Sequence, residues 1–293
     1  MSNTSKSNIL SIVIPCYNSQ STIMRLVSSM RRQIAPSEWD VTFVDDHSYD
    51  HTVDSILSQM KPNPLQQSDP RFRILINPAK GAGSARNYGM QQTVGEYLWF
   101  IDSDDYIPNG YAFSILLNAI HKNPDVDLFT MNCIAVDDAG KKVNKSFTNL
   151  RADSNLYGKV LSRKDFIQNF ESLYSAIGFP PWNKVVRRKF LEKNKINFQN
   201  TLFCNDQYFS IRCMVEAQKI YMISSDPLYC WSNAGRFHTS RADLKKSHPE
   251  QYGIVLEGLD KKCKWPNDEI RKKILEDRSK QFKCDILKKS GRL

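Results

Sequence analysis

The chain has 293 residues, of which 41% are hydrophobic and 25% charged, a composition that is ordinary for a soluble globular protein and argues against disorder. Its formal charge is +10, but residues 261–293 hold 12 Lys or Arg against 5 Asp or Glu and so carry +7 of it. No N-terminal stretch resembles a signal peptide and the most apolar runs, such as residues 97–101, are too short to span a bilayer, so we expect a cytoplasmic protein.

The first hundred residues alternate between short apolar runs and segments in which apolar residues return at helical spacing. The apolar, β-branched runs predict strands at residues 9–14, 41–44, 72–76 and 97–101. The segments between them predict helices around residues 23–30 and 53–60 and directly after the loop at 81–87. Strands that alternate with helices indicate a mostly parallel sheet with helices on both faces, and ligands of such sheets bind at the carboxyl ends of the strands.

Beyond residue 106 the pattern is less regular. Helices are expected at residues 112–121, 164–173, 184–193 and 206–217, with a strand at 127–133. From about residue 266 the spacing of Ile270, Ile274, Phe282 and Ile286 predicts an amphipathic helix with a very basic outer face. A basic tail can meet anionic lipid, nucleic acid or an acidic substrate, and composition does not choose among these.

Three acidic residues, Asp102, Asp104 and Asp105, follow the fourth predicted strand. If the backbone there is extended, the side chains of Asp102 and Asp104 lie on one side and that of Asp105 on the other. Two carboxylates that face one point suit Mg²⁺ or Mn²⁺, which take oxygen ligands and bind phosphates in addition. Such an ion stabilises the charge that develops when a bond to a diphosphate breaks. The alternative is that these residues only form a turn and cap the next helix.

The glycines after the third predicted strand raise a rival interpretation. Gly81 and Gly83, with an acid at a fitting distance in Asp102, could belong to the dinucleotide-binding unit of a dehydrogenase. The third position of that fingerprint is Asn87 rather than Gly, and the next strand ends in three carboxylates rather than one. The sequence therefore favours the metal and diphosphate site.

Four motifs in chain order resemble those of family 2 glycosyltransferases of the GT-A fold. They are SIVIPCYN at 11–18, VDDHSYD at 44–50, GAGSARNYG at 81–89 and GEYLWFIDSDD at 95–105. Weaker similarity continues through PWNK at 181–184, ND at 205–206 and PLYCW at 227–231. The resemblance implies an α/β fold with a GT-A (Rossmann-like), mostly parallel sheet flanked by helices. It also implies a nucleotide-sugar glycosyltransferase domain over residues 8–240 and a basic helical extension over 241–293.

The resemblance implies inverting transfer of a sugar from a nucleoside diphosphate sugar, with Mn²⁺ or Mg²⁺ as cofactor. By the same resemblance, Asp46 contacts the base, Asp102 reaches the ribose and Asp104 binds the metal ion. Asp45, beside Asp46 at the end of the second strand, can accept hydrogen bonds from the base or the ribose. The other residues expected to contact the nucleotide sugar are Pro15, Tyr17, Asn18, Arg86, Ser103 and Trp182.

Trp182 and His238 carry open alternatives, and Asp206 and Asn205 bear on the reaction itself. Trp182 either stacks on a sugar face or is a buried core aromatic. His238 is either a further metal or phosphate ligand or a surface or satisfied histidine. Asp206 stands where the family has the general base that takes the proton of the acceptor hydroxyl. Asn205 departs from the family pattern, which has Glu there, and a catalytically silent nucleotide-sugar-binding or scaffold protein of the same fold is therefore the alternative function.

The implied enzyme is a hexosyl- or N-acetylhexosaminyltransferase. It is expected to use a UDP-sugar and a glycan or lipid-linked acceptor in bacterial-type surface polysaccharide or glycoconjugate synthesis. The basic C-terminal helix suggests peripheral contact with the inner face of the cell membrane, where lipid-linked acceptors are extended, and a solvated helix packed on the catalytic domain is the alternative. No nucleic-acid partner is expected, because no recognised nucleic-acid motif accompanies the charge.

Overall fold

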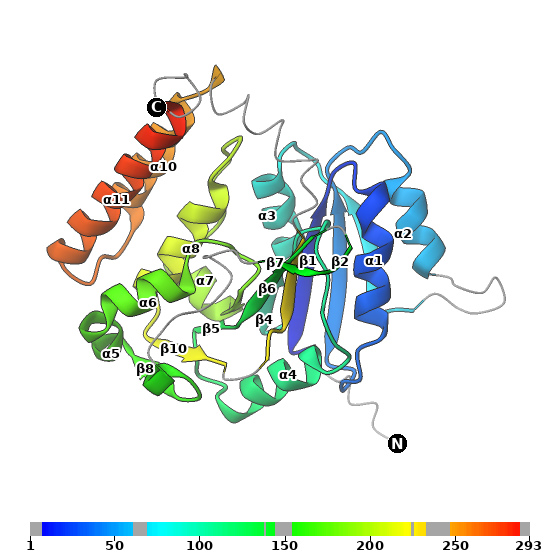
Figure 1. Cartoon of the computed structure of the whole chain (residues 1–293). Coiled ribbons are helices and arrows are strands. Elements are labelled where there is room, and N and C mark those ends of the chain that lie inside the picture. The colour runs from blue at the N-terminus through cyan, green and yellow to red at the C-terminus, as the bar shows by residue number, and fades with distance from the viewer. Residues whose placement is uncertain are drawn as a thin grey trace.

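The computed structural model describes residues 8–60, 69–137, 139–143, 154–223, 226–232 and 247–287, and two sheets form its centre (Figure 1). The strands of the large sheet are Leu10–Cys16 (β1), Trp39–Asp45 (β2), Phe72–Ile76 (β3), Tyr97–Phe100 (β4), Leu128–Thr130 (β5), Val160–Ser162 (β8), Lys184–Arg187 (β9) and Lys219–Met222 (β10). They lie in the order β3-β2-β1-β4-β9-β5-β10-β8. The small sheet has the order β11-β6-β7, formed by Tyr229–Ser232 (β11), Cys133–Val136 (β6) and Lys142–Val143 (β7).

The large sheet is mostly parallel, as the sequence predicts. Strands β3, β2, β1 and β4 run in the same direction, with β1 at the centre of this group, paired with β2 and β4. Strand β9 is antiparallel to both of its neighbours, β4 and β5, whereas β10 is parallel to β5. The carboxyl ends of β1, β2 and β4 therefore lie at one edge of the sheet.

Helices cover both faces of the large sheet. One face carries Gln20–Arg31 (α1), Thr52–Met60 (α2) and Ala112–Lys122 (α4). The other carries Ala82–Gln92 (α3), Arg163–Gln168 (α5), Phe170–Ile177 (α6), Arg188–Asn194 (α7) and Asn205–Glu216 (α8); a 3₁₀ turn, Ser154–Leu156 (η1), precedes β8. Because side chains alternate along a strand, Tyr97 and Trp99 of β4 enter the first core and Leu98 and Phe100 the second.

Three predicted elements differ from the structure. The strand expected at 127–133 is divided into β5 and β6, which belong to different sheets. The helix expected at 164–173 is two helices, α5 and α6, which meet at Asn169. The helix expected at 184–193 begins as strand β9 and becomes helical only at Arg188, because residues 184–187 complete the sheet between β4 and β5.

Two C-terminal helices, Glu250–Lys262 (α10) and Asp268–Leu287 (α11), form a hairpin on the side of the molecule away from α1 and α2 (Figure 1). The sequence predicts α11 but not α10. Buried side chains of both helices belong to the same core as α8; they are Tyr252, Val255, Leu259, Ile270, Ile274 and Phe282. The expected domain boundary at 240/241 lies outside the described residues. Within the described ranges, no helix is both long enough and apolar enough to cross a membrane.

The very basic outer face predicted for the C-terminal helix is not present on α11. Residues 268–287 hold six Lys or Arg and five Asp or Glu. Some of these charges are paired, as in the contact between Arg271 and Asp260 at 2.6 Å and the contact between Lys273 and Glu171 at 3.8 Å. Of the net charge of +7 in residues 261–293, +3 comes from residues 261–267 and +3 from residues 288–293, and the structure does not describe the latter segment.

Phe282→Ala tests whether the hairpin is part of the folded core. The Phe282 ring is 2% exposed and stacks on Tyr252 with ring centroids 4.3 Å apart. Removing a buried aromatic ring costs about 3–5 kcal/mol of unfolding free energy. We expect urea unfolding to show that loss, whereas Lys283→Ala, at an exposed position on the same helix, stays within about 0.5 kcal/mol of wild type. Equal stabilities for the two variants would contradict the shared core.

Candidate active site

The loops that follow β1, β2 and β4 are joined to one another by side-chain hydrogen bonds. The backbone N–H of Asn18 donates to Ser48 Oγ at 3.0 Å, which links the first loop to the second. The hydroxyls of Ser19 and Ser103 are 2.7 Å apart, which links the first loop to the third. The edge of the sheet at which the sequence predicts a ligand site is therefore one connected surface.

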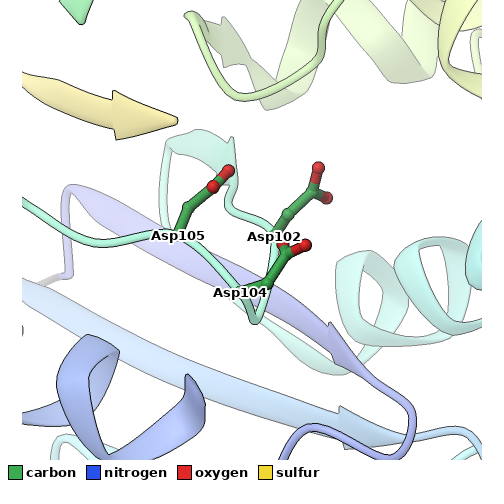
Figure 2. A group of neighbouring side chains, drawn as sticks. All are labelled: Asp102, Asp104 and Asp105. Atoms are coloured by element: carbon green, nitrogen blue, oxygen red, sulfur yellow. The ribbon is translucent and has the colours of Figure 1, made fainter. Parts of the chain in front are cut away.

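The acidic residues after β4 converge on one point, as Figure 2 shows. One carboxylate oxygen from each of Asp102, Asp104 and Asp105 lies within 4.8 Å of the others. Of the two alternatives, the backbone forms a turn and is not extended, because the N–H of Asp105 donates to the carbonyl of Asp102 at 3.2 Å. This turn brings Asp105 to the same side as the other two, which corrects its predicted position. We call residues 102–105 the acidic turn.

The acidic turn has the chemistry of a divalent-cation site. Asp102 and Asp104 are partly exposed, whereas Asp105 is 1% exposed. Burial, followed by the negative charges of Asp104 and Asp102, raises the pKa of Asp105 well above its usual value. A bound cation would offset this repulsion, and carboxylate oxygens are the ligands that Mg²⁺ and Mn²⁺ prefer. The other predicted metal ligand, His238, lies outside the described residues.

The two acids at the end of β2 have different surroundings. Asp45 is buried and accepts a hydrogen bond from the N–H of Ser48 at 3.1 Å, so its carboxylate orders the loop that follows β2. Asp46 is partly exposed and accepts from the N–H of Gly81 at 2.8 Å and from Asn77 Nδ2 at 2.7 Å. Of the two, only Asp46 is placed to meet a ligand at the surface.

The other residues expected to contact the nucleotide belong to β1 and the loop after it. Pro15 lies within the buried strand β1. Asn18 has a left-handed backbone, with φ +49°, and its side-chain oxygen accepts from the N–H of Tyr49 at 3.0 Å. The rings of Tyr17 and Tyr49 meet edge to face at 6.2 Å and are 54% and 84% exposed. These loops thus offer exposed aromatic surface beside Asp46.

Arg86 of α3 connects the acidic turn to the start of α8. Its guanidinium donates to Asp102 Oδ1 at 2.6 Å and to Asn205 Oδ1 at 3.1 Å, and the residue is only 5% exposed. Asn205 begins α8 and Asp206, which follows it, is partly exposed. The bridge therefore places the predicted general base near the acidic turn, although the two are far apart in sequence.

The glycines of the rival dinucleotide fingerprint have local roles in this chain. Gly81 has φ +105°, a conformation that favours glycine, and its N–H binds Asp46. A Cβ added at Gly83 would lie 2.6 Å from the carbonyl oxygen of Gln199 and 3.3 Å from Asn205 Cγ. Gly83 thus permits α3 to pack closely against the segment that leads into α8.

Trp182, which was predicted to contact the nucleotide sugar, lies in the hydrophobic core. It is 3% exposed, and its ring stacks on Tyr229 with centroids 4.8 Å apart and an interplanar angle of 5°. Its carbonyl accepts a hydrogen bond from Trp99 Nε1 at 2.6 Å. Of the two alternatives for Trp182, the structure has the buried core aromatic, which corrects its placement among the sugar contacts.

Three residues near the site were not predicted from sequence. Arg25 of α1 donates to the carbonyl of Asp104 at 2.9 Å. The hydroxyl of Tyr229 donates a hydrogen bond to the carboxylate of Asp105. Lys184 is fully buried, where burial lowers its pKa to about 7, and its Nζ donates to the carbonyl of Pro180 at 2.7 Å. Lys184 and Tyr229 fall in motifs with weak family similarity, whereas Arg25 gives no sequence signal.

The chain is similar to known glycosyltransferases over most of its length. The sequence pattern described as glycosyl transferase family 2 matches residues 11–194. A putative glycosyltransferase, EpsH of Bacillus subtilis, is 28% identical over 75% of this chain. The poly(ribitol-phosphate) beta-N-acetylglucosaminyltransferase TarS of Staphylococcus aureus is 27% identical over 84% of this chain. The chain spans 59% of the first relative and 39% of the second.

A shorter match and two solved structures complete the comparison. A UDP-Glc:alpha-D-GlcNAc-diphosphoundecaprenol beta-1,3-glucosyltransferase, WfgD of Escherichia coli, is 36% identical over 33% of this chain and 35% of its own length. The structure of S. aureus TarS 1–349 with UDP-GlcNAc has a TM-score of 0.67 and 21% identity, covering 96% of this chain and 73% of that one. The mannosyltransferase PcManGT of Pyrobaculum calidifontis, with GDP-Man and Mn²⁺, has a TM-score of 0.57 and 16% identity, covering 86% and 65%. The GT-A fold is thereby established.

Proposed function

Because the chain belongs to glycosyl transferase family 2, we propose that it transfers a sugar, with inversion, from a nucleoside diphosphate sugar to a hydroxyl group of an acceptor. The observation that carries this proposal is the pairing of the acidic turn with the start of α8 through Arg86. One side of this arrangement suits a metal-bound diphosphate, and the other offers a carboxylate, Asp206, to the acceptor. Both are needed for a direct displacement at the sugar carbon.

The acidic turn is proposed to hold Mn²⁺ or Mg²⁺, with Asp104 as the ligand and Asp102 directed to the ribose of the donor. When bound, the cation neutralises charge on the diphosphate leaving group. Asp46 is proposed to accept a hydrogen bond from the base, with Tyr17 beside the nucleotide. Pro15, Asn18 and Ser103 shape the loops around it, and Arg86 holds Asp102 in place.

Asp206 is proposed to take the proton from the acceptor hydroxyl as that oxygen attacks the sugar. The residue lies in the first turn of α8 and is partly exposed, so its carboxylate is accessible to an acceptor. Attack from the side opposite the leaving diphosphate inverts the configuration at the sugar carbon. Asp206 thus acts on the acceptor side and the acidic turn on the donor side.

The donor is proposed to be a UDP-sugar and the transferred group a hexose or an N-acetylhexosamine. TarS, whose solved structure contains UDP-GlcNAc, supports this choice, as does WfgD, whose name specifies UDP-Glc. The same relatives support a polyol-phosphate glycan or a lipid-linked sugar as the acceptor. The proposed setting is the synthesis of a surface polysaccharide or glycoconjugate at the cytoplasmic face of the cell membrane.

A thermal-shift panel of nucleotide sugars, with and without Mn²⁺, tests the donor class. A ligand at 100 times its Kd raises the unfolding free energy by about 2.7 kcal/mol, which gives a measurable shift in Tm. We expect a UDP-sugar to raise Tm in the presence of Mn²⁺, and NAD⁺ to leave it unchanged. Stabilisation by NAD⁺ without any divalent ion would instead support the dehydrogenase interpretation.

One observation favours a second candidate, a catalytically silent nucleotide-sugar-binding or scaffold protein of the same fold. Asn205 gives Arg86 a neutral amide where the family has a carboxylate, and this residue lies next to Asp206. Such a protein would bind the donor without releasing its nucleotide in the presence of an acceptor. Acceptor-dependent UDP release separates it from the enzyme.

Peripheral contact with an anionic membrane is also proposed, through the basic residues that follow α11. Lys288, Lys289 and Arg292 add three positive charges in a segment that contains no acidic residue. Each basic residue near an anionic surface contributes about 1 kcal/mol, so replacing all three by Gln is expected to weaken binding to phosphatidylserine vesicles about 100-fold. Replacing Lys261, Lys262 and Lys264 of the hairpin by Gln is the matched control. Unchanged co-sedimentation of the first triple variant would contradict the proposal.

A further inference from the structure

Tyr229 of β11 makes two contacts with the acidic turn. Its hydroxyl donates to Asp105 Oδ2 and accepts a hydrogen bond from the backbone N–H of Asp102 at 3.3 Å. The residue is fully buried, and its ring is held by the parallel stack with Trp182. A single hydroxyl group therefore touches both ends of the turn that carries the predicted metal ligand.

Asp105 depends on β11 for its hydrogen bonds. Besides the hydroxyl of Tyr229, its carboxylate accepts from the N–H of Ser232 at 2.6 Å. Because Asp105 is buried, loss of either donor would leave a carboxylate oxygen without compensation for its desolvation. These two hydrogen bonds hold the Asp105 carboxylate on β11. Asp105 in turn holds the end of the acidic turn against that strand.

A separate contact ties the middle of the acidic turn to the same strand. One nitrogen of Arg25, Nη2, donates to the carbonyl of Asp104 at 2.9 Å and to Ser232 Oγ at 2.8 Å. The guanidinium also lies over the ring of Tyr106, 4.7 Å from its centroid. Asp102, Asp104 and Asp105 are therefore each connected to β11, directly or through Arg25.

We infer that Tyr229 is a positioning residue for metal binding: its hydroxyl holds the acidic turn in the shape in which the carboxylates of Asp102 and Asp104 converge. The inference rests on the proposed function, because it assigns the metal ion to that turn. Arg25 assists by fixing the Asp104 carbonyl to Ser232. Neither residue touches the ion or the donor; they act through the backbone of the turn and through Asp105.

Tyr229→Phe tests the inference, because it removes the hydroxyl and keeps the ring that stacks on Trp182. The quantity to measure is the Mn²⁺ concentration that gives half of the maximal UDP binding in a calorimetric titration. Loss of a group that orients metal ligands typically weakens metal affinity about 10- to 100-fold. We expect that increase in the Mn²⁺ requirement, together with recovery of most UDP binding at saturating Mn²⁺.

Tyr97→Phe is the matched control. Tyr97 is a buried tyrosine whose hydroxyl donates to the carbonyls of Pro124 at 2.7 Å and Val126 at 3.1 Å, at the other end of β4. It should lose stability without a change in the Mn²⁺ requirement. If Tyr229→Phe does not fold, Arg25→Met, which removes the link from Asp104 to Ser232, is expected to raise the requirement in the same direction.

The outcomes separate this inference from the proposed function. A wild type that binds UDP only with Mn²⁺, with the same Mn²⁺ requirement in Tyr229→Phe and Tyr97→Phe, would overturn the positioning role alone. An unchanged Mn²⁺ requirement in a folded Arg25→Met variant would also overturn the positioning role. A wild type whose UDP binding ignores Mn²⁺ would overturn the proposed metal site, and the positioning role with it.

Discussion

Asp206→Asn is expected to lower kcat for sugar transfer about 1000-fold while leaving the affinity for UDP within about twofold of wild type. A positioned general base contributes about 10²–10⁴ to the rate, and the amide of Asn has no comparable basicity. The substitution is nearly isosteric, and an amide oxygen can also accept the hydrogen bond that Asp206 Oδ1 accepts from the N–H of Gln207 at 2.9 Å. The loss should therefore be confined to the chemical step.

The control for this variant is Asp268→Asn. Asp268 also lies in the first turn of a helix, but its side chain is 83% exposed and α11 is remote from the acidic turn. The kcat of Asp268→Asn for sugar transfer should equal that of wild type. If Asp206→Asn retained more than about a tenth of the wild-type kcat, the proton would have to be taken by another group, and the assignment of Asp206 would be wrong.

Asp104→Asn is expected to remove the Mn²⁺ dependence of UDP binding and to lower transfer by at least about 100-fold. A catalytic metal ion supplies several kcal/mol of charge stabilisation to a leaving phosphate, and about 3 kcal/mol corresponds to 100-fold in rate. The substitution removes one negative charge from a cluster in which like charges already raise the pKa of Asp105. The fold should therefore tolerate it, and Tm without ligand should not fall.

Asp125→Asn serves as the control for Asp104. The Asp125 side chain is 72% exposed and lies beside Arg187, the last residue of β9, and Lys219, the first residue of β10. Both lie at the edge of the sheet opposite to the acidic turn. Titrations of UDP with Mn²⁺ and with a chelator, for both variants and wild type, give the comparison. A donor affinity in Asp104→Asn that still responds to Mn²⁺ as in wild type would show that the ion binds elsewhere.

The strands that lead into the site, β1, β2 and β4, were predictable because almost all of their residues are buried. All residues of β1 are buried, so the strand appears in the sequence as a continuous apolar run between polar segments. Strand β9 could not be recognised in this way. Its residues, Lys184, Val185, Val186 and Arg187, resemble the start of the helix that follows, and only pairing with β4 and β5 makes them a strand.

The positions of candidate site residues were predictable where the residues fall in short motifs. Asp104, Asp46 and Asp206 fall in short motifs, and the fold brings their loops to one edge of the sheet or, through Arg86, to its vicinity. Residues that act through contacts distant in sequence were missed: Tyr229 meets Asp102 across 127 positions. The sequence left the shape of the acidic turn open, because that shape depends on the hydrogen bond from Asp105 to Asp102 and on the contacts of both with β11.

The most direct test of metal-dependent sugar transfer at this site is UDP release from a UDP-sugar, measured with and without an acceptor, such as a ribitol-phosphate oligomer or a polyprenyl-diphosphate-linked sugar. The donor is the one that the thermal-shift panel selects. The predicted result is acceptor-dependent UDP release in Mn²⁺ that is lost in chelator and in Asp206→Asn. Release that persists unchanged in chelator and in Asp206→Asn would contradict the assignment of the acidic turn and of the base. Donor binding without release, across both acceptor classes, would favour the silent binding protein instead.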